Sequence, residues 1–201
     1  MPADKLKIIL PVYFLIYFTV LALWRVFSVK RKYGVNPFVL PGTDNAYGLI
    51  GFYTKLIFLL IALVLIIFVF LPSWYQYLIP ISYLQSEMMQ ETGLTVLAIV
   101  FVWILFAQNE MQSSWRIGID FRHKTKLITT GLFRYSRNPI FLGLIVTMLS
   151  LFLVLPNAIT LIVFIVSFVL INIQIRLEED FLRKTFGKDY EDYCKKVRRW
   201  C

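Results

Sequence analysis

Long apolar runs separated by short polar connections dominate the chain. The runs cover residues 6–27, 48–71, 92–107, 140–155 and 158–173. Because a membrane-spanning helix needs about 20 mostly apolar residues, this pattern predicts an all-α, polytopic membrane bundle of about five transmembrane helices. The first run offers no small-residue cleavage site around Trp24 and Arg25, so we expect it to remain as a helix and not to be removed as a signal peptide.

The connections between the runs differ in their polar character. Residues 33–47, YGVNPFVLPGTDNAY, are rich in glycine, proline, asparagine and aspartate, and they predict a loop. Residues 72–90 mix tryptophan and tyrosine with apolar side chains, which is typical of a segment lying at a membrane interface. No internal repeat is present, and the runs are too closely spaced for separate soluble domains. We therefore expect a single domain over residues 1–201.

The last two apolar runs are joined by only Pro156 and Asn157. So short a connection predicts an antiparallel helical hairpin, whose two helices must be neighbours. On the first helix of the hairpin, Gly143, Thr147 and Ser150 recur at helical spacing on one face. Small residues on such a face allow another helix backbone to approach closely.

Basic residues are sorted by connection, although the chain is 59% hydrophobic and only 16% charged, with a net charge of +9. Lys30, Arg31 and Lys32 follow the first run, and further basic residues lie between the third and fourth runs and after the fifth, whereas residues 72–91 contain none. The positive-inside rule then predicts an integral membrane protein with its N-terminus outside and a helical C-terminal tail in the cytoplasm. Membrane lipids are the expected partners of these charges, and nucleic acid is not. The oligomeric state stays open.

The cysteines and the histidine do not predict a metal site. Cys194 and Cys201 fall in the cytoplasmic tail, where thiols stay reduced, and His123 has no plausible fellow ligands. We therefore expect neither a structural disulfide nor a bound metal.

Polar residues gather where the fourth run begins, in the segment GLFRYSRNPIFLGL. Pro139 suits the first turn of a helix, which makes Asn138 the expected N-cap and turns the positive end of the helix dipole toward the cytoplasmic boundary. Arg137 beside it can bind a carboxylate or phosphate in bidentate fashion. The alternative for Arg134 and Arg137 is snorkelling to lipid phosphates.

A second polar group follows the fifth run, in INIQIRLEEDF. Arg176 and Glu179 lie on one helix face, and Gln174 and Glu178 form another pair four residues apart. Ionisable groups this close to a bilayer usually face a cavity or a partner, although an ion pair from Arg176 to Glu179 or Asp180 on the same helix is the simpler alternative. Because the hairpin turns at the opposite membrane face, we expect both polar groups to meet at its cytoplasmic mouth.

The segments TTGLFRYSRNPIFLG and RLEEDFLRKTFGKDYEDYCKKVRRW, taken in this order, resemble the integral-membrane methyltransferases of the isoprenylcysteine carboxyl methyltransferase and phospholipid methyltransferase superfamily. The resemblance covers about residues 115–200. It implies S-adenosylmethionine bound by the C-terminal part of the chain, about residues 115–201, without a Rossmann domain. The cofactor-binding positions that it implies are Leu127, Ile128, Phe133, Asn138, Pro139, Phe141, Gly143, Glu178 and Glu179.

The chain departs from the family pattern at three of its positions. Asn138 replaces a frequent histidine and Phe141 a tyrosine, while Gln174 stands where eukaryotic members carry an arginine for the substrate carboxylate. Arg176 is the nearby arginine, and we expect it, with Gln174, to contact the substrate.

The predicted reaction is methyl transfer to a lipophilic acceptor at the cytoplasmic membrane face, most like carboxyl methylation of an isoprenylcysteine. Arg137, Arg176 and Glu179 are the expected catalytic residues, the arginines by orienting an anionic acceptor and Glu179 by contacting the cofactor's cationic side. Two alternatives stay open, namely N-methylation of a phospholipid or another small lipid, and an NAD(P)H-dependent membrane reductase of related architecture.

Overall fold

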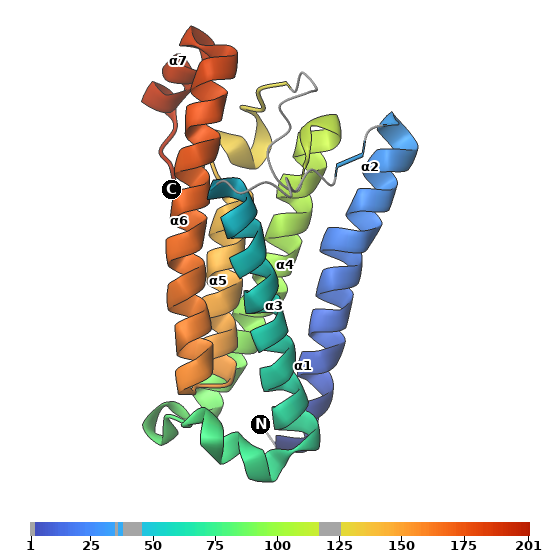
Figure 1. Cartoon of the computed structure of the whole chain (residues 1–201), viewed down its shortest axis with the longest axis vertical. Helices are drawn as coiled ribbons and strands as arrows, with labels where there is room; N and C mark the ends of the chain where they lie inside the picture. The colour runs from blue at the N-terminus through green and yellow to red at the C-terminus, as the bar shows by residue number, and fades with distance from the viewer. Residues whose placement is uncertain (1–2, 35, 38–45, 117–125) are drawn as a thin grey trace.

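The chain folds into a bundle of long helices that stand side by side (Figure 1). A computed structural model describes residues 3–34, 36–37, 46–116 and 126–201. Most of the loop predicted over residues 33–47, and His123, therefore lie outside the described residues. The helical elements, of which η1 is a π-helical segment and the other η elements are 3₁₀ turns, are α1 (Ala3–Phe18), η1 (Thr19–Trp24), α2 (Arg25–Tyr33), α3 (Ala46–Phe70), η2 (Pro72–Leu78), η3 (Ser82–Leu84), α4 (Glu87–Met111), η4 (Gln112–Ser114), η5 (Gly131–Arg134), α5 (Pro139–Val154), α6 (Ala158–Phe186) and α7 (Lys188–Lys196).

Four of these helical stretches are long and apolar enough to cross a membrane. They are Asp4–Tyr33, Ala46–Phe70, Glu87–Ser114 and Ala158–Phe186, and the apolar helix Pro139–Val154 is shorter. The predicted all-α membrane bundle is thereby confirmed. At 1.5 Å per residue, the 16 residues of α5 span about 24 Å, less than the roughly 30 Å of a hydrocarbon core. The turn η5 precedes α5 in the chain, and the polar residues predicted for the site lie between η5 and the first turn of α5.

Two helices extend beyond the apolar runs that predicted them. α6 continues past residue 173 to Phe186, because the polar residues that follow the run include no glycine or proline before Gly187. α4 begins at Glu87 and not at residue 92, because the Ser86 hydroxyl caps it by accepting a hydrogen bond from Met89 N at 3.2 Å. A polar turn capped in this way is helical despite its low hydropathy.

The predicted hairpin between α5 and α6 is confirmed. Asn157 caps α6 in a capping box, in which its side chain accepts from Thr160 N at 3.0 Å while Asn157 N donates to the Thr160 hydroxyl. Ile81 N also donates to Pro156 O at 2.9 Å, which fastens the η2 and η3 region to this turn. That region lies at the end of the bundle opposite α7 (Figure 1).

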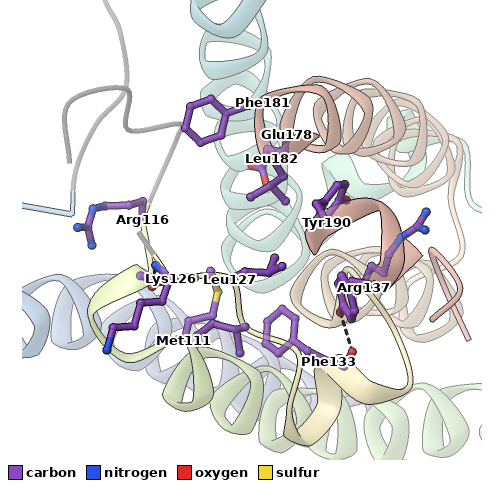
Figure 2. A pocket seen from close by; sticks show the side chains of 13 residues that line it. Met111, Arg116, Lys126, Leu127, Phe133, Arg137, Glu178, Phe181, Leu182 and Tyr190 are labelled. Carbon is purple, nitrogen blue, oxygen red and sulfur yellow. Dashed lines mark hydrogen bonds between the residues drawn. The ribbon is translucent and has the colours of Figure 1, made fainter. Parts of the chain in front are cut away.

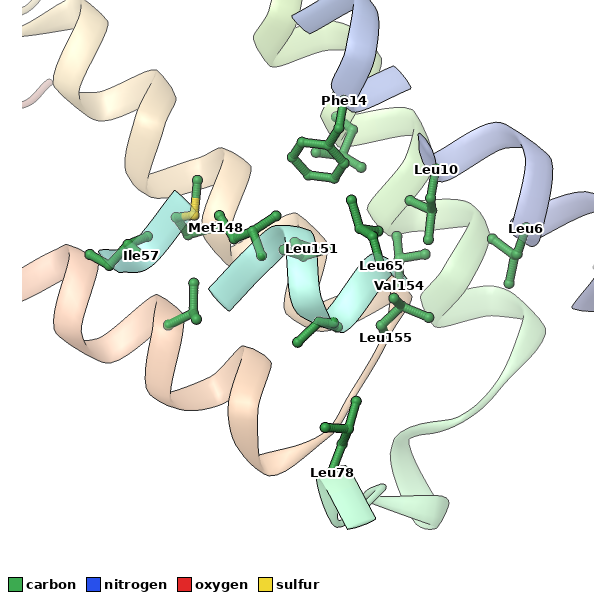
Figure 3. Packing of buried hydrophobic residues seen from close by; sticks show 14 residues of the cluster. Leu6, Leu10, Phe14, Ile57, Leu65, Leu78, Met148, Leu151, Val154 and Leu155 are labelled. Atoms are coloured by element: carbon green, nitrogen blue, oxygen red, sulfur yellow. The ribbon is translucent and has the colours of Figure 1, made fainter. Parts of the chain in front are cut away.

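The bundle buries one apolar core and exposes apolar side chains on its outer surface. The core joins Leu10, Leu65, Leu151 and Val154 from three different helices (Figure 3). Large hydrophobic side chains are nevertheless exposed along the outer faces of the helices, among them Ile8, Leu15, Phe52, Ile99, Phe106 and Val169. A surface of this kind is stable in lipid, where helices satisfy their own backbone hydrogen bonds.

Small residues set the distance between α4 and α5, which pack together more extensively than any other pair of described helices. A Cβ on Gly93 would lie 2.6 Å from the Val154 side chain and 3.0 Å from Ser150 O, and a Cβ on Gly143 would overlap the Ile104 side chain. Thr147 is fully buried beside them. The close helix approach predicted from the small residues of the fourth run is therefore confirmed.

Replacing Gly93 by alanine should force α4 away from α5, because Ser150 O belongs to the backbone and cannot rotate aside. Overpacking of this kind costs about 1 to 3 kcal/mol, so the apparent melting temperature in detergent should fall by several degrees. The matched control is Ala98→Val, which adds methyl groups at an exposed position of the same helix and should leave the melting temperature unchanged. Equal effects of the two substitutions would contradict the close contact.

Candidate active site

An extended strip and one short turn lead the chain into α5. Residues 126–130 are not helical, and η5 follows them directly. Glu110, in the last turn of α4, accepts a hydrogen bond from Leu132 N at 2.8 Å. Gly131 has a φ of +60° and lies against the same carboxylate, so that a Cβ there would overlap it. The end of α4 therefore fixes where the strip runs.

The strip, the end of α4, the C-terminal half of α6 and α7 enclose a cavity of about 130 Å³, here called the polar cavity (Figure 2). Leu127 and Phe133 come from the strip and η5, and Phe181 and Leu182 come from α6. The remaining lining residues are Met111, Ser114, Arg116, Lys126, Ile128, Arg137, Glu178, Tyr190 and Tyr193. Aromatic rings, aliphatic side chains and charges of both signs thus share one enclosure.

A second cavity, of about 280 Å³ and here called the apolar cavity, lies deeper in the bundle. Its walls come from α1 and η1, α3, α4, α5 and α6, and they include Phe18, Leu21, Phe58, Ile104, Ile140 and Phe141. Met111, Arg116 and Glu178 line both cavities. A polar compartment and an apolar one therefore meet at these three side chains.

Glu178 is the carboxylate at this junction. Its Oε1 accepts a hydrogen bond from Gln174 Nε2 at 3.1 Å, and Gln174 itself lines the apolar cavity. In Figure 2 the Glu178 side chain stands with Leu182 and Phe181 on the α6 wall, across the cavity from Met111 and Leu127. The site thus offers one carboxyl group beside both compartments.

Glu179, the next residue, is buried elsewhere, between two arginines. Its Oε1 lies 3.0 Å from Arg137 Nη2 and its Oε2 lies 2.7 Å from Arg199 Nη2, while Arg199 Nε donates a further bond to Oε1 at 3.1 Å. Glu179 is only 2% exposed. The hydrogen bonds to its carboxylate raise the pKa of the Arg199 guanidinium, although burial of that guanidinium opposes the rise.

These ion pairs draw the C-terminal segment onto the start of α5. Arg137 N donates to Arg198 O at 3.0 Å. The Ser136 hydroxyl and Asn138 Nδ2 both donate to Arg199 O, each at 3.3 Å. Asn138 therefore stands at the N-cap position of α5, but its side chain binds the tail and makes no capping hydrogen bond. The predicted N-cap position is thus confirmed, whereas the prediction of a capping hydrogen bond was wrong: the side-chain hydrogen bond of Asn138 runs from Nδ2 to the tail carbonyl.

Two tyrosines of α7 close the polar cavity on the side of the tail. The Tyr193 hydroxyl donates to Phe133 O at 2.6 Å, and Tyr190 is 1% exposed. Burial raises the pKa of both phenols above the ordinary value, so both are neutral rings over the physiological pH range. α7 thereby holds η5 and supplies aromatic surface to the cavity.

The structure brings together most of the predicted site residues. Leu127, Ile128, Phe133, Arg137 and Glu178 line the polar cavity, and Phe141, Gln174 and Glu178 line the apolar one. The predicted meeting of the two polar groups is confirmed by the Arg137 to Glu179 ion pair.

Other predicted residues lie outside the cavity walls. Pro139 O accepts a hydrogen bond from Trp103 Nε1 at 2.8 Å, and Gly143 packs against Ile104, so both hold α5 against α4. Arg176 is exposed and is not among the lining residues of either cavity. Glu179 pairs with Arg137 and Arg199 and not with Arg176, the alternative that the sequence had left open.

Several residues of the site were not singled out from the sequence. They are Met111, Arg116, Lys126, Tyr190, Tyr193 and Arg199. Tyr190, Tyr193 and Arg199 lie in the segment RLEEDFLRKTFGKDYEDYCKKVRRW, which carries the family resemblance. This segment was the available signal for α7 and Arg199. Met111 had no such signal, because a methionine at the end of an apolar helix is ordinarily a packing residue.

The chain is similar in sequence to known proteins. A family model described as phospholipid methyltransferase matches residues 87–189, which run from the start of α4 into α7. A probable protein-S-isoprenylcysteine O-methyltransferase of Oryza sativa subsp. indica is 34% identical over 82 residues, covering 40% of this chain and 43% of that protein. A protein-S-isoprenylcysteine O-methyltransferase of Dictyostelium discoideum is 39% identical over 72 residues, covering 35% of this chain and 30% of that protein.

The similarity to these relatives is partial. The aligned part corresponds to less than half the length of each of the two relatives. No solved structure matches the chain.

Replacing Glu179 by glutamine should loosen the tail from the bundle. The substitution leaves two arginines without a counter-ion, and breaking a buried pair costs about 3 to 5 kcal/mol. Because Arg199 is partly exposed, with 31% of its side chain accessible, we expect about 3 kcal/mol. Trypsin should then cleave at Lys195, Lys196 and Arg198 faster than in the wild type.

Asp192→Asn is the matched control for this substitution. It removes the exposed ion pair between Asp192 and Lys195 in α7, and such surface pairs contribute at most about 1 kcal/mol. Unchanged proteolysis of the Glu179 variant, or equal proteolysis of both variants, would show that the buried pair does not hold the tail.

Gly131→Ala should displace the strip that lines the polar cavity. The substitution combines a strained backbone with overlap of the new Cβ and the Glu110 carboxylate. Gly34→Ala is the control, because Gly34 has a φ of +67° but no atom within 4 Å of its ideal Cβ. The Gly131 variant should lose more thermal stability in detergent than the Gly34 variant, and equal losses would remove Glu110 as the anchor of the strip.

Proposed function

Because the chain belongs to the phospholipid methyltransferase family, we propose that it transfers a methyl group from S-adenosylmethionine to a lipophilic acceptor. The observation that carries the proposal is the pair of adjoining cavities, one polar and one apolar, with Glu178 in the wall of both. A charged, water-soluble donor suits the first compartment, and a lipid chain suits the second. The reaction would take place where the two meet.

The residues of the polar cavity fit the donor. A cationic sulfonium or ammonium group bound beside Glu178 would favour the ionised form of this carboxyl group and be attracted to it. The rings of Phe133, Phe181 and Tyr190 provide faces for a flat base. Arg137 Nε is buried and has no hydrogen-bond partner among the described residues. A donor left unpaired beside a cavity is suited to a carboxylate of a bound ligand.

Bound S-adenosylmethionine would supply an electrophilic methyl group carried on a positively charged sulfur. The chain's own contribution is alignment and the exclusion of water. Positioning of two reactants contributes up to about 7 to 11 kcal/mol to lowering a barrier, and the walls formed by Phe133, Tyr190 and Met111 keep the junction dry. An acceptor carboxylate needs no base, whereas an acceptor ammonium must first lose a proton, for which Glu178 is the carboxylate in place.

The roles of the predicted catalytic residues then divide between contact and support. Glu178 contacts the donor, and Arg137 orients an anionic group of the donor or the acceptor. Glu179 acts through Arg137 by fixing its guanidinium, and Asn138 acts through the tail carbonyl that it binds. Because the Arg176 side chain is exposed, its proposed role is to contact the head group of the acceptor or of a lipid outside the cavities.

The cavities should open toward the cytoplasm. The basic end of α2, which carries Lys30, Arg31 and Lys32, lies at the same end of the bundle as the strip, η5 and α7 (Figure 1). The last turn of α7 and the residues after it add Lys195, Lys196, Arg198 and Arg199. The positive-inside rule assigns such an end to the cytoplasmic side. We expect the N-terminus of α1, at the opposite end, to lie outside.

The acceptor is best matched by the carboxylate of a prenylated cysteine, since the relatives carry that activity in their names. A phospholipid amine, suggested by the family description, is the second candidate. Transfer of a radiolabelled methyl group from S-adenosylmethionine into a panel of prenylcysteines and phospholipids, with product identified by mass, decides between them. NADPH serves as the competitor that tests the reductase alternative, and absence of transfer to every acceptor would overturn the proposal.

Glu178→Gln should weaken binding of S-adenosylhomocysteine and S-adenosylmethionine by at least about tenfold, because a charge-assisted contact contributes about 1.5 to 3 kcal/mol. The effect should be larger for S-adenosylmethionine, which carries the additional positive charge. Calorimetric titration of the detergent-purified protein measures both affinities. The control Asp180→Asn removes an exposed carboxylate of the same helix, whose ion pair with Arg183 spans 3.6 Å, and should leave both affinities unchanged.

A further inference from the structure

A polar side chain interrupts the otherwise apolar wall that α4 gives to the apolar cavity. Gln108 lines this cavity together with Ile104 and Met111 of the same helix. It is 5% exposed. A buried amide inside a membrane helix costs free energy unless its donor and its acceptor are both satisfied, so the hydrogen bonds of Gln108 can be accounted for one by one.

The orientation of this amide is fixed. Gln108 Nε2 donates to Leu21 O at 3.0 Å, and the main-chain oxygen of Gln108 accepts from Arg25 Nη2. A flipped amide would place its oxygen against Leu21 O, where two acceptors repel each other. The geometry therefore leaves Oε1 as the group that remains to be satisfied.

Gln108 Oε1 is buried and has no hydrogen-bond partner in the part of the chain that the structure describes. Two donors on the neighbouring walls are engaged elsewhere, while the buried Tyr17 hydroxyl, which lines the same cavity, is unpaired as well among the described residues. Gln174 Nε2 donates to Glu178, and Arg116 Nη1 donates to the carbonyls of Ser113 and Trp115. Since no described residue donates to Gln108 Oε1, this oxygen is available to a donor on a molecule bound in the cavity.

The segment facing Gln108 is itself unusual. Leu21, which accepts its hydrogen bond, lies in η1, the π-helical segment Thr19–Trp24, and π-helical turns occur frequently at functional sites. Leu21 and Ala22 of this segment line the apolar cavity. Two independent features, an unpaired buried acceptor and a π-helical turn, thus meet at one wall.

Resting on the proposed function, we propose that Gln108 selects the acceptor by taking a hydrogen bond from an N–H or O–H group that the acceptor carries. Gln108 precedes Met111 by three residues, so it lies about 4.5 Å along the helix axis from the junction of the two cavities. The donor group then belongs near the polar end of the acceptor and not far along its chain. The amide N–H of a prenylated cysteine and the free hydroxyl of a lysophospholipid both meet this requirement.

Two matched pairs of probes separate these sources. The first pair is N-acetyl-S-farnesylcysteine and the ester analogue in which oxygen replaces the N–H. The second pair is a lysophosphatidylethanolamine with a free 2-hydroxyl and its 2-deoxy counterpart. Wild-type protein and Gln108→Met are compared in detergent, and KM and kcat for methyl transfer are measured for each probe. Gln90→Met, at the far end of α4, is the matched control.

For at least one pair, the wild type should show a KM about five- to tenfold lower for the probe that carries the donor, with similar kcat values. Gln108→Met should abolish this difference, and Gln90→Met should retain it. Discrimination within the first pair identifies an amide, and within the second a hydroxyl. No discrimination in either pair by the wild type, or discrimination that survives in Gln108→Met, overturns the proposal.

A binding measurement keeps this test separate from the test of the reaction. Stabilisation of the protein against thermal unfolding is measured with the same probes, in the absence of any methyl donor. If no probe is methylated, the proposed reaction fails, while stronger stabilisation by the donor-bearing probe still supports the role of Gln108. If Gln108→Met does not fold, the wild-type comparison within each pair decides, since equal stabilisation by both members contradicts the proposal.

Discussion

One buried carboxylate, that of Glu179, holds three distant parts of the chain at the mouth of the bundle. Arg137 comes from the start of α5 and Arg199 from the C-terminal segment, and both donate to it. Glu179 and Arg137 are buried, and separating a buried carboxylate from its guanidinium partners is costly, so the ion pairs oppose release of the tail. The docked tail positions α7, and α7 supplies Tyr190 and Tyr193 to the polar cavity. The two ion pairs therefore help to hold this wall of the cavity in place, together with the hydrogen bond from the Tyr193 hydroxyl to Phe133 O.

The neighbouring glutamate is free for a different task because of helix geometry. Successive residues of an α-helix are turned by about 100°, so Glu178 cannot face the tail when Glu179 does. It faces the junction of the two cavities instead, where Gln174 supports it from one turn earlier. A carboxylate held by a single neutral partner can respond to a bound cation, whereas one held by two arginines cannot.

Hydropathy predicted the helices and the hairpin, because an apolar run of sufficient length has one stable structure in lipid. It could also predict that the two polar groups meet, since a two-residue turn leaves the hairpin no other arrangement. It could not predict which way α6 is rotated, and for that reason Arg176 was expected in the site and is exposed. The hydrogen-bond partner of Asn138 could not be predicted either. It is the Arg199 carbonyl, 61 residues further along the chain, and hydropathy does not indicate that the C-terminal tail folds back onto α5.

The two cavities draw on different parts of the chain, and this bears on specificity. The family match covers residues 87–189, which include the α4, η5 and α6 walls of the polar cavity. Tyr17, Leu21 and Phe58 of the apolar cavity all precede that range. On the proposed assignment, the donor side is built from the matched part together with Tyr190 and Tyr193 just beyond it. The acceptor side combines the matched part with α1, η1 and α3. Gln108 lies within the matched part but donates to Leu21 O outside it, so a segment that precedes the family match fixes the orientation of its amide.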